Sequence, residues 1–387
     1  MLEDRLAAEL ADIAAAGLTR RRRVLASPCG RLATVDGREV LNFASNDYLG
    51  LAGSAEIAAA LADGARQWGA GSGASHLVAG HLAPHEALEK ELAAFTGFPR
   101  ALTFSTGYLA NLAVTPTLAG RGASVFSDKL NHASLIDAMQ LAKAAGADVH
   151  RYPHGDIAAL ERQLAASAAP VKLIVTDAVF SMDGDLAPLP ALFALAERFD
   201  AWLVVDDAHG FGVLGVQGRG SLAHFNLPAH PRIILMGTLG KAAGVGGAFV
   251  AGSETTIDYL LNKGRSYIFT TAAPPAIACA LATSLDLIRT GDGLRRQLFA
   301  NIARLRDGLA GLPWRLLPSA TAIQPLIVGE NDAAVALAAA LWARGLWVPA
   351  IRPPTVPPGS ARLRVSVSAA HTETDIDHLL SALKELA

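Results

Sequence analysis

Cysteine and charge are both scarce in this chain. Only two cysteines, Cys29 and Cys279, occur in 387 residues, too few for a disulfide framework or a cysteine-rich zinc site. Charged residues make up 18% of the chain and the net charge is −2. Binding of nucleic acid by phosphate neutralisation needs an excess of basic groups. We therefore expect two reduced thiols, no metal site and no nucleic-acid partner.

Long apolar runs are also lacking. The longest one, residues 333–343, falls well short of the roughly 20 residues that span a bilayer. The first 17 residues mix charges of both signs with apolar positions, unlike a secretory leader. Because 51% of the residues are hydrophobic, a large core is expected. The sequence predicts a globular cytoplasmic protein without a membrane contact.

Short β-branched runs alternate with longer helical patterns in the middle of the chain. The runs cover residues 171–176, 202–205 and 232–236, and a helical pattern covers 189–199. This alternation predicts an α/β fold with a mostly parallel sheet that helices cover on both faces. Asp177, Asp206 and Thr238 come just after the three runs. Ligands of such sheets bind at the carboxyl ends of the strands, so we expect chemistry there.

The pattern changes toward the C-terminus. It predicts a helix over 333–345, a strand over 346–351, irregular structure over the proline-rich 352–359, a half-buried strand over 362–368 and a helix from Thr372. We expect an N-terminal segment (1–44) that packs with a small domain, a large α/β domain (45–280) and a small α+β domain (281–387).

Lys241 lies in a glycine-rich loop, residues 236–247, that follows an apolar run. A lone lysine in such a loop is usually a solvated surface residue. Small neighbours, however, leave room for a planar group to approach the backbone, and a lysine with a lowered pKa forms Schiff bases with carbonyls.

Asp206 and His209 follow the run 202–205. Asp206 could simply cap the next helix. Its alternative role is to pair with a pyridinium N–H, as carboxylates do in pyridoxal-phosphate enzymes, with His209 near the phenolic oxygen of the ring. The series strand, Asp, His, strand and Lys is more specific than any of its parts.

A phosphate would need free N–H groups at a helix start. Residues 105–111 combine two hydroxyls, Gly107 and a helical continuation, although an ordinary capped helix has the same pattern. Thr238 could add a hydroxyl.

Three further positions are less specific. His132 follows a strand-like run and could stack on a cofactor ring, and Ser181 lies in a turn after another run. Arg362 and Arg364 share one face of a strand, where an arginine can clamp a carboxylate; the pattern does not choose between them.

Other classes of protein fit less well. Residues 69–74 match a dinucleotide-binding GxGxxA, but a helix pattern precedes them where a strand is required. A metallohydrolase could use His76, His81 and His85 together with Asp206 and His209, although no HExxH motif is present. A binding protein without catalysis would not need Lys, Asp, His and a phosphate cradle at strand ends.

Five motifs resemble those of the α-oxoamine synthases, fold-type I pyridoxal-phosphate enzymes. They are residues 45–50 (SNDYLG), 69–80 with 85–89, 180–185 (FSMDGD), 206–210 (DDAHG) and 238–241 (TLGK). One departure is Asp177, where relatives commonly carry glutamate.

The resemblance implies a set of site residues. It implies Lys241 as the Schiff-base lysine, Asp206 at the pyridine nitrogen, His132 stacked on the ring, and His209 and Ser181 on the phenolic side. Around the phosphate of pyridoxal 5'-phosphate it implies Gly107, Tyr108 and Thr238. At the substrate it implies His132, Thr355, Arg364 and an N-terminal arginine, taken as Arg20. It also implies a homodimer in which Thr270 or Thr271 reaches the partner's phosphate.

The late motifs, residues 322–329 and 351–364, are similar to the branch of the family that condenses L-alanine with a pimeloyl thioester in biotin biosynthesis. The acyl carrier, coenzyme A or acyl-carrier protein, stays open. A sibling that uses glycine and another acyl-CoA, such as glycine C-acetyltransferase, is the alternative within the family.

Overall fold

A seven-stranded sheet forms the centre of the larger part of the molecule. The computed structural model describes all 387 residues. The strand order across the sheet is β3 (Arg100–Phe104), β9 (Ala248–Gly252), β8 (Ile233–Thr238), β7 (Trp202–Asp206), β6 (Val171–Asp177), β4 (Ala123–Asp128) and β5 (Asp148–Tyr152). Only β9 runs against the other strands. The predicted α/β fold with a mostly parallel sheet is confirmed.

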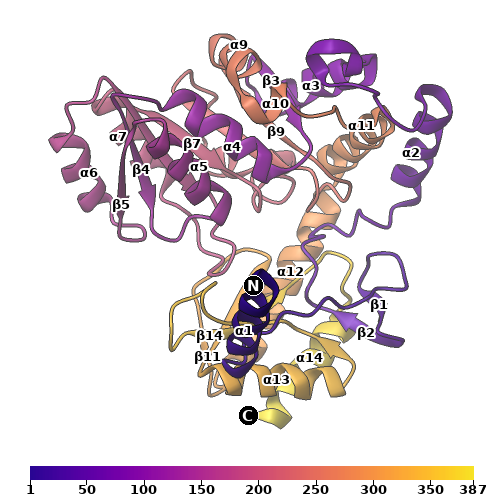
Figure 1. Cartoon of the computed structure of the whole chain (residues 1–387). Coiled ribbons are helices and arrows are strands. Elements are labelled where there is room, and N and C mark those ends of the chain that lie inside the picture. Colours follow the sequence, from indigo (N-terminus) through magenta and orange to yellow (C-terminus); the bar gives the residue numbers. More distant parts are fainter.

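Helices cover both faces of this sheet (Figure 1). One face packs against α4 (Gly107–Leu118), α5 (Ala133–Ala144), α9 (Glu254–Lys263) and α10 (Arg265–Ile268). The other packs against α3 (Ala83–Thr96), α6 (Ile157–Ala166), α7 (Leu189–Arg198) and α11 (Pro275–Thr290), with α2 (Ala55–Trp68) against α11. Shorter turns complete this part: a π-helical turn η1 (His76–Gly80), a 3₁₀ turn η2 (Val216–Gly218) and α8 (Ser221–His224).

The central strands of the large sheet are apolar along their whole length because their side chains point alternately into two hydrophobic cores. In β8, Ile234 and Met236 join the core under α4 and α5, whereas Ile233 and Leu235 join the core under α6 and α7. Side chains of a strand point alternately to opposite faces, so burial on both sides removes the polar alternation of a half-exposed sheet.

The smaller part contains two sheets. An antiparallel sheet has the order β10 (Arg315–Leu316), β11 (Ile323–Gly329), β14 (Ala361–Ser366) and β13 (Ala350–Ile351). A second sheet has the order β1 (Leu32–Val35), β2 (Arg38–Asn42) and β12 (Leu346–Trp347). Three helices accompany them: α12 (Asp292–Leu309), α13 (Asn331–Ala343) and α14 (Glu373–Leu386).

Local sequence signals account for several boundaries. Thr372 and Asp375 form a reciprocal capping box at the start of α14, which satisfies two N–H groups of its first turn. The strand predicted over 346–351 is instead two strands in different sheets. Pro349 lies between them and has no N–H to donate, so the ladder is interrupted there.

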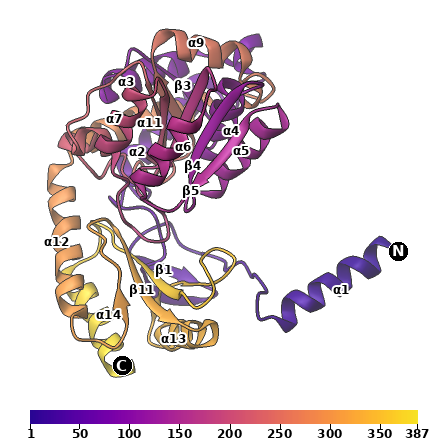
Figure 2. The same ribbon diagram turned by 90° about the vertical axis from the view of Figure 1, so that its left-hand side faces the viewer.

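The ends of the two parts differ from the residue ranges that the sequence suggested. Residue 280 lies inside α11, which packs on α2 and α3, while α12 packs on α14. We therefore propose that the parts divide at Gly291, between α11 and α12. Figures 1 and 2 show α12 leading from the large part to the small one.

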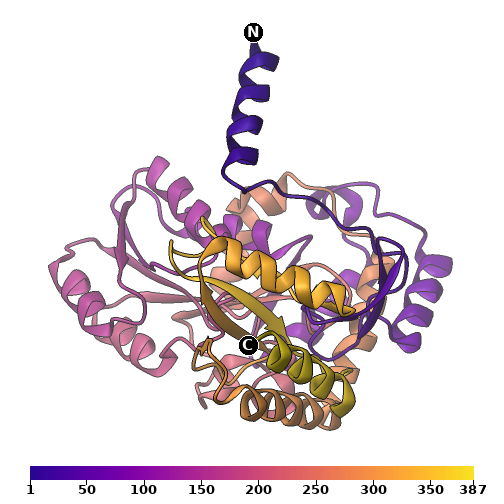
Figure 3. The same ribbon diagram turned by 90° about the horizontal axis from the view of Figure 1, so that it is seen from below.

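The N-terminal segment behaves in two ways. β2 pairs with β1 on one side and with β12 of the small part on the other. Helix α1 (Leu2–Ala15) buries no side chain and points away from the body of the molecule (Figures 2 and 3). No helix of the structure has both the length and the apolar composition to cross a membrane.

Stability should depend strongly on the middle of the large sheet. Phe249 on β9 is fully buried and packs edge-on against Phe211 at 5.0 Å. We expect Phe249→Ala to lower the free energy of unfolding by about 3–5 kcal/mol, because it removes buried apolar area and leaves a cavity. Urea unfolding measures the change. As a control, Phe299→Ala on the partly exposed surface of α12 should cost far less; equal losses would contradict this account.

Candidate active site

The carboxyl ends of the strands that run in the same direction meet along one edge of the large sheet. Phe104 of β3 and Thr238 of β8 both pair with Ala248, and Asp177 of β6 pairs with Asp206 of β7. A cavity of about 190 Å³ opens at this edge. Its lining is Gly107, Tyr108, His132, Ser134, Asp177, Asp206, Ala208, His209, Met236, Thr238 and Lys241. We call it the sheet-edge cavity.

Two carboxylates lie side by side at the floor of this cavity, both buried. Asp206 accepts hydrogen bonds from Asn111 Nδ2 at 2.8 Å and from the N–H of Ala208 at 3.0 Å. Asp177 accepts one from the N–H of His132 at 2.6 Å. Burial and the negative charge of Asp206 raise the pKa of Asp177 well above its ordinary value. The pair therefore favours one proton on Asp177 and a cation beside Asp206.

Lys241 contacts a chain of hydrogen bonds that ends at Arg364. Its Nζ is 2.8 Å from Nε2 of His209, whose Nδ1 is 2.6 Å from the hydroxyl of Tyr48. That hydroxyl donates to Oδ1 of Asn46 at 3.1 Å, which also accepts from Arg364 Nη1 at 3.2 Å. One proton assignment satisfies the chain: Nδ1 of His209 donates to Tyr48, and its Nε2 accepts from Lys241.

The electrostatic surroundings lower the pKa of both nitrogen bases, Lys241 and His209. Burial, only partly opposed by Asp206 and Asp177, lowers the pKa of Lys241 to about 8. Burial and the nearby positive charge of Lys241 lower the pKa of His209 well below its ordinary value. A large neutral fraction of Lys241 near pH 8 makes it a nucleophile and a base.

An anion-binding cradle faces the cavity at the start of α4. Thr106 caps the helix by accepting from the N–H of Leu109 at 3.2 Å. The first-turn N–H groups of Gly107 and Tyr108 have no partner within the helix. A Cβ at position 107 would lie 3.4 Å from Met236 and 4.0 Å from the hydroxyl of Thr238. Free N–H groups, the helix dipole and that hydroxyl together suit a phosphate.

His132 lies at the mouth of the cavity, on the loop between β4 and α5. Its ring caps α5 by accepting from the N–H of Ser134 at 3.2 Å, and Asp177 holds its backbone. Burial lowers the pKa of His132. A neutral imidazole with one exposed face can lie against a planar ligand.

Residues 38–383 match the family model described as aminotransferase class I and II. The chain belongs to this family. It is 80% identical to the 8-amino-7-oxononanoate synthase of Dechloromonas aromatica (strain RCB), over 100% of both chains. These matches confirm the resemblance that the motifs indicated.

Two solved structures show the same architecture. A serine palmitoyltransferase variant from S. paucimobilis with bound PLP–myriocin superimposes with a TM-score of 0.92 at 31% identity, covering 99% of this chain and 96% of that one. The 8-amino-7-oxononanoate synthase of Francisella tularensis gives a TM-score of 0.77 at 31% identity, covering 90% and 98%. In both cases the sequence identity of 31% accompanies the shared fold.

The structure brings most of the family-type residues together, but not all. The sheet-edge cavity is lined by Gly107, Tyr108, His132, Asp206, His209, Thr238 and Lys241. Ser181 and Arg364 lie outside this lining, where Nε of Arg364 donates to the backbone oxygen of Ser181 at 2.6 Å. Arg362, the other candidate on this strand, is paired with Asp183.

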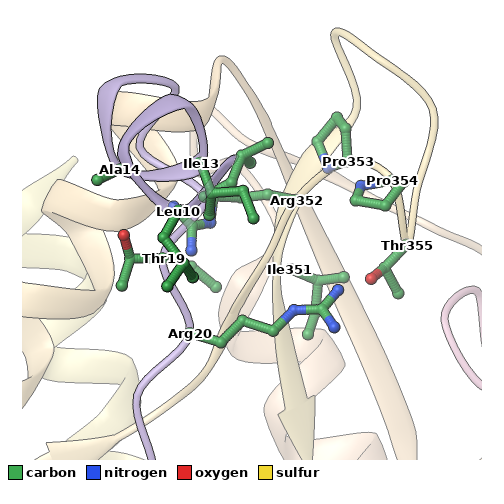
Figure 4. A pocket seen from close by; sticks show the side chains of 12 residues that line it. Leu10, Ile13, Ala14, Thr19, Arg20, Ile351, Arg352, Pro353, Pro354 and Thr355 are labelled. Carbon is green, nitrogen blue, oxygen red and sulfur yellow. The ribbon is translucent and has the colours of Figure 1, made fainter. Parts of the chain in front are cut away.

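Arg20 and Thr355 line a different cavity of about 700 Å³. Leu10 and Ile13 of α1 form one wall and Ile351 belongs to the opposite side. The guanidinium group of Arg20 points toward Thr355 (Figure 4). This cavity combines apolar walls with two arginines, Arg20 and Arg352. We call it the Arg20 pocket.

The three histidines of the alternative metal interpretation do come together. His76 and His81 are 2.8 Å apart at their Nδ1 atoms, and His85 lies within ligand distance of both. However, Nε2 of His85 donates to the carbonyl of Ala273, and Nδ1 accepts from the N–H of Leu82. With both nitrogens engaged and none of the three in the sheet-edge cavity, this cluster does not support a metallohydrolase.

Sequence reasoning missed several residues that complete the site. Tyr48 and Asn46 belong to the SNDYLG motif, but no chemistry was assigned to them because the motif precedes the sheet. Asn111 follows Gly107 by four positions, so it lies on the same face of α4 one turn later. This four-residue spacing between Gly107 and Asn111 was the sequence feature that could have identified Asn111. The sequence places Asp177 at the end of a strand, where chemistry is expected, but does not show that it pairs with Asp206.

The lowered pKa of Lys241 can be measured directly. In the protein without cofactor, we expect trinitrobenzenesulfonate to label Lys241 at a rate that reaches half its maximum near pH 8, because only the neutral amine reacts. Peptide mass spectrometry over a pH series follows the labelling, with the exposed Lys263 as an internal comparison. Superimposable profiles for the two lysines would contradict the account.

Proposed function

We propose that the chain catalyses the reaction of the 8-amino-7-oxononanoate synthases. L-alanine and a pimeloyl thioester give 8-amino-7-oxononanoate, carbon dioxide and the free thiol carrier, with pyridoxal 5'-phosphate as cofactor, as a step of biotin biosynthesis. The observation that carries the proposal is the convergence of the Lys241 amine, the Asp206 carboxylate and the open start of α4 on one cavity. The 80% identical relative supports the choice of reaction.

The residues of the cavity fit pyridoxal phosphate by their chemistry. Asp206 would pair with the ring N–H, and the free N–H groups of Gly107 and Tyr108 with the hydroxyl of Thr238 would hold the phosphate. Nearby, Oδ1 of Asn111 is buried without a hydrogen-bond partner. When bound, the cofactor supplies an aldehyde for amines and a protonated ring that withdraws electrons from the α-carbon of the amino acid.

Lys241 and His209 would handle the proton of the α-carbon. The neutral amine of Lys241 can accept this proton, because its pKa is already lowered to about 8. Nε2 of His209 stands 2.8 Å away and stabilises the resulting ammonium group. The fixed carboxylate of Asp206 would hold the proton on the ring nitrogen of the bound cofactor.

Arg364 would bind the carboxylate of alanine. It is buried. Its Nε donates a hydrogen bond to the carbonyl of Ser181, and its Nη1 donates to Oδ1 of Asn46 and to the hydroxyl of Ser366. These bonds fix the guanidinium plane and leave Nη2 for a ligand. A held guanidinium loses little entropy on binding a carboxylate.

The Arg20 pocket would take the acyl chain. Pimelate carries a carboxylate at the far end of a run of methylene groups. The apolar walls of the pocket suit the methylenes, and Arg20 beside Thr355 suits the carboxylate.

Assembly and location complete the proposal. Leu77 and Val78 of η1 and Phe269, just after α10, are exposed apolar side chains. The two elements pack against each other. Thr270 and Thr271 directly follow Phe269. This apolar patch supports a homodimer in which those threonines reach the partner's phosphate. Both cysteines are free thiols, which supports a reducing compartment, the cytoplasm.

A product assay tests the function. The cofactor-loaded protein should convert L-alanine with pimeloyl-CoA, pimeloyl-acyl-carrier protein or both into 8-amino-7-oxononanoate, detected by mass spectrometry. Lys241→Ala should abolish product and the visible absorbance of the bound cofactor together, whereas Lys263→Ala on the surface should retain both. Product from glycine and acetyl-CoA alone, or an active Lys241→Ala variant, would overturn the proposal.

Arg20→Ala tests the acyl pocket. We expect the KM for the pimeloyl thioester to rise about tenfold, the cost of one charge-assisted hydrogen bond, while the KM for alanine stays unchanged. Arg21→Ala, at the exposed neighbouring position, serves as the matched control. A rise in the alanine KM, or equal effects of the two variants, would show that Arg20 does not bind the acyl chain.

A further inference from the structure

One charged cluster beside the site is not used by the proposed chemistry. His154 follows β5 and lies between two carboxylates, with Nδ1 at 3.1 Å from Asp128 and Nε2 at 2.8 Å from Asp185. Burial alone would lower the pKa of His154, but the two carboxylates outweigh it and raise the pKa to about 10. The imidazole is therefore a cation that joins two negative groups. Because both ring nitrogens are occupied, it has no atom left for a metal.

The first partner, Asp128, organises the segment that carries His132. Asp128 ends β4 and is buried. Its carboxylate accepts the N–H of Leu130 at 2.8 Å and that of Gly155 at 2.9 Å. The segment from Asp128 to His132 is thus tied to the end of β4, with His154 supplying the balancing charge.

The second partner, Asp185, belongs to the loop that carries Ser181. This loop, residues 180–185, is closed by bonds between the backbones of Phe180 and Asp185 at 3.0 Å and of Phe180 and Gly184 at 2.7 Å. The ring of Phe180 lies edge-on to His154 at 4.4 Å. We call residues 180–185 the Ser181 loop.

The small part of the molecule holds the opposite side of the Ser181 loop. The hydroxyls of Ser319 and Thr321 donate to the carbonyl of Gly184 at 2.8 and 3.0 Å. Gly184 has a φ of +72° and a Cβ there would collide with Ser319. Arg362 pairs with Asp183, and Arg364 binds the carbonyl of Ser181. The loop is therefore a bridge between the two parts.

We propose that His154 is a positioning residue that locks the Ser181 loop to the end of β4, so that Arg364 and His132 face the same substrate. Without a cation at this place, Asp128 and Asp185 would face each other as like charges with Asp128 buried, which is unfavourable. The Ser181 loop would then shift. The carbonyl of Ser181, which orients the side chain of Arg364, would shift with it. This inference rests on the proposed function for the role of Arg364, but the lock itself does not.

Hydrogen exchange of the protein without cofactor tests the lock. His154→Ala should leave the fold intact but accelerate exchange in the Ser181 loop and in residues 128–132. His150→Ala is the matched control, since His150 lies on β5 just before His154, stacks on Phe126 and makes no bridge between carboxylates. Unchanged exchange in both segments, or the same change in the control, would overturn the proposal, whatever reaction the protein catalyses.

Kinetics of the loaded enzyme test the consequence. His154→Ala should raise the KM for alanine about tenfold and leave the KM for the pimeloyl thioester unchanged, because only the carboxylate clamp is misplaced. Asp185→Asn should have a similar effect, and the double variant should be no worse than the poorer single one, since both changes break one bridge.

A wild-type alanine KM in both single variants, or additive effects in the double variant, would contradict the positioning role. If His154→Ala does not fold, Asp185→Asn decides alone, because it removes a charge without changing shape. A wild-type enzyme that makes no product from alanine would refute the proposed function instead, and exchange would still report on the lock.

Discussion

Parallel register is the constraint on which the site depends. β4, β6, β7 and β8 run in the same direction and end at one edge, so residues far apart in sequence meet there. Asp206 and Lys241 could not share a cavity if either strand were reversed. The same register places Asp177 next to Asp206, which creates the buried carboxylate pair. The order and direction of the strands therefore determine which side chains meet in the site.

Two basic groups near this edge, Lys241 and His154, have opposite electrostatic environments. Inside the sheet-edge cavity, burial disfavours the charged form of Lys241 and leaves a reactive amine. About His154 the opposite holds, because two carboxylates outweigh burial and keep a cation. The first environment serves reactivity. The second serves geometry, since a permanent ion pair holds the Ser181 loop between the large and small parts.

Sequence reasoning succeeded where local pattern is sufficient. The runs that became β6, β7 and β8 were recognisable because burial on both faces demands continuous apolar residues. Lys241, Asp206 and His209 were recognisable because they follow those runs directly. It failed where a residue contacts the site from a distant part of the chain. Tyr48 contacts His209, 161 positions away, and no periodicity connects them. The strand expected over 346–351 failed for a related reason, since Pro349 divides it between two sheets.

The sequence by itself determined the class of fold and the kind of chemistry, because apolar periodicity specifies strands and helices, and because a lysine, an aspartate and a histidine after successive strands are close in any parallel sheet. The family resemblance favoured Arg364 over Arg362 at the substrate, but only the tertiary structure gives a physical difference between the two arginines. Arg362 and Arg364 share a strand face, but Asp183 neutralises the first while backbone and amide oxygens merely hold the second. Tertiary contacts also decided that Arg20 and Thr355 form a cavity of their own. Such outcomes depend on which loops meet in space, and that information is spread over the whole chain rather than written in any one segment.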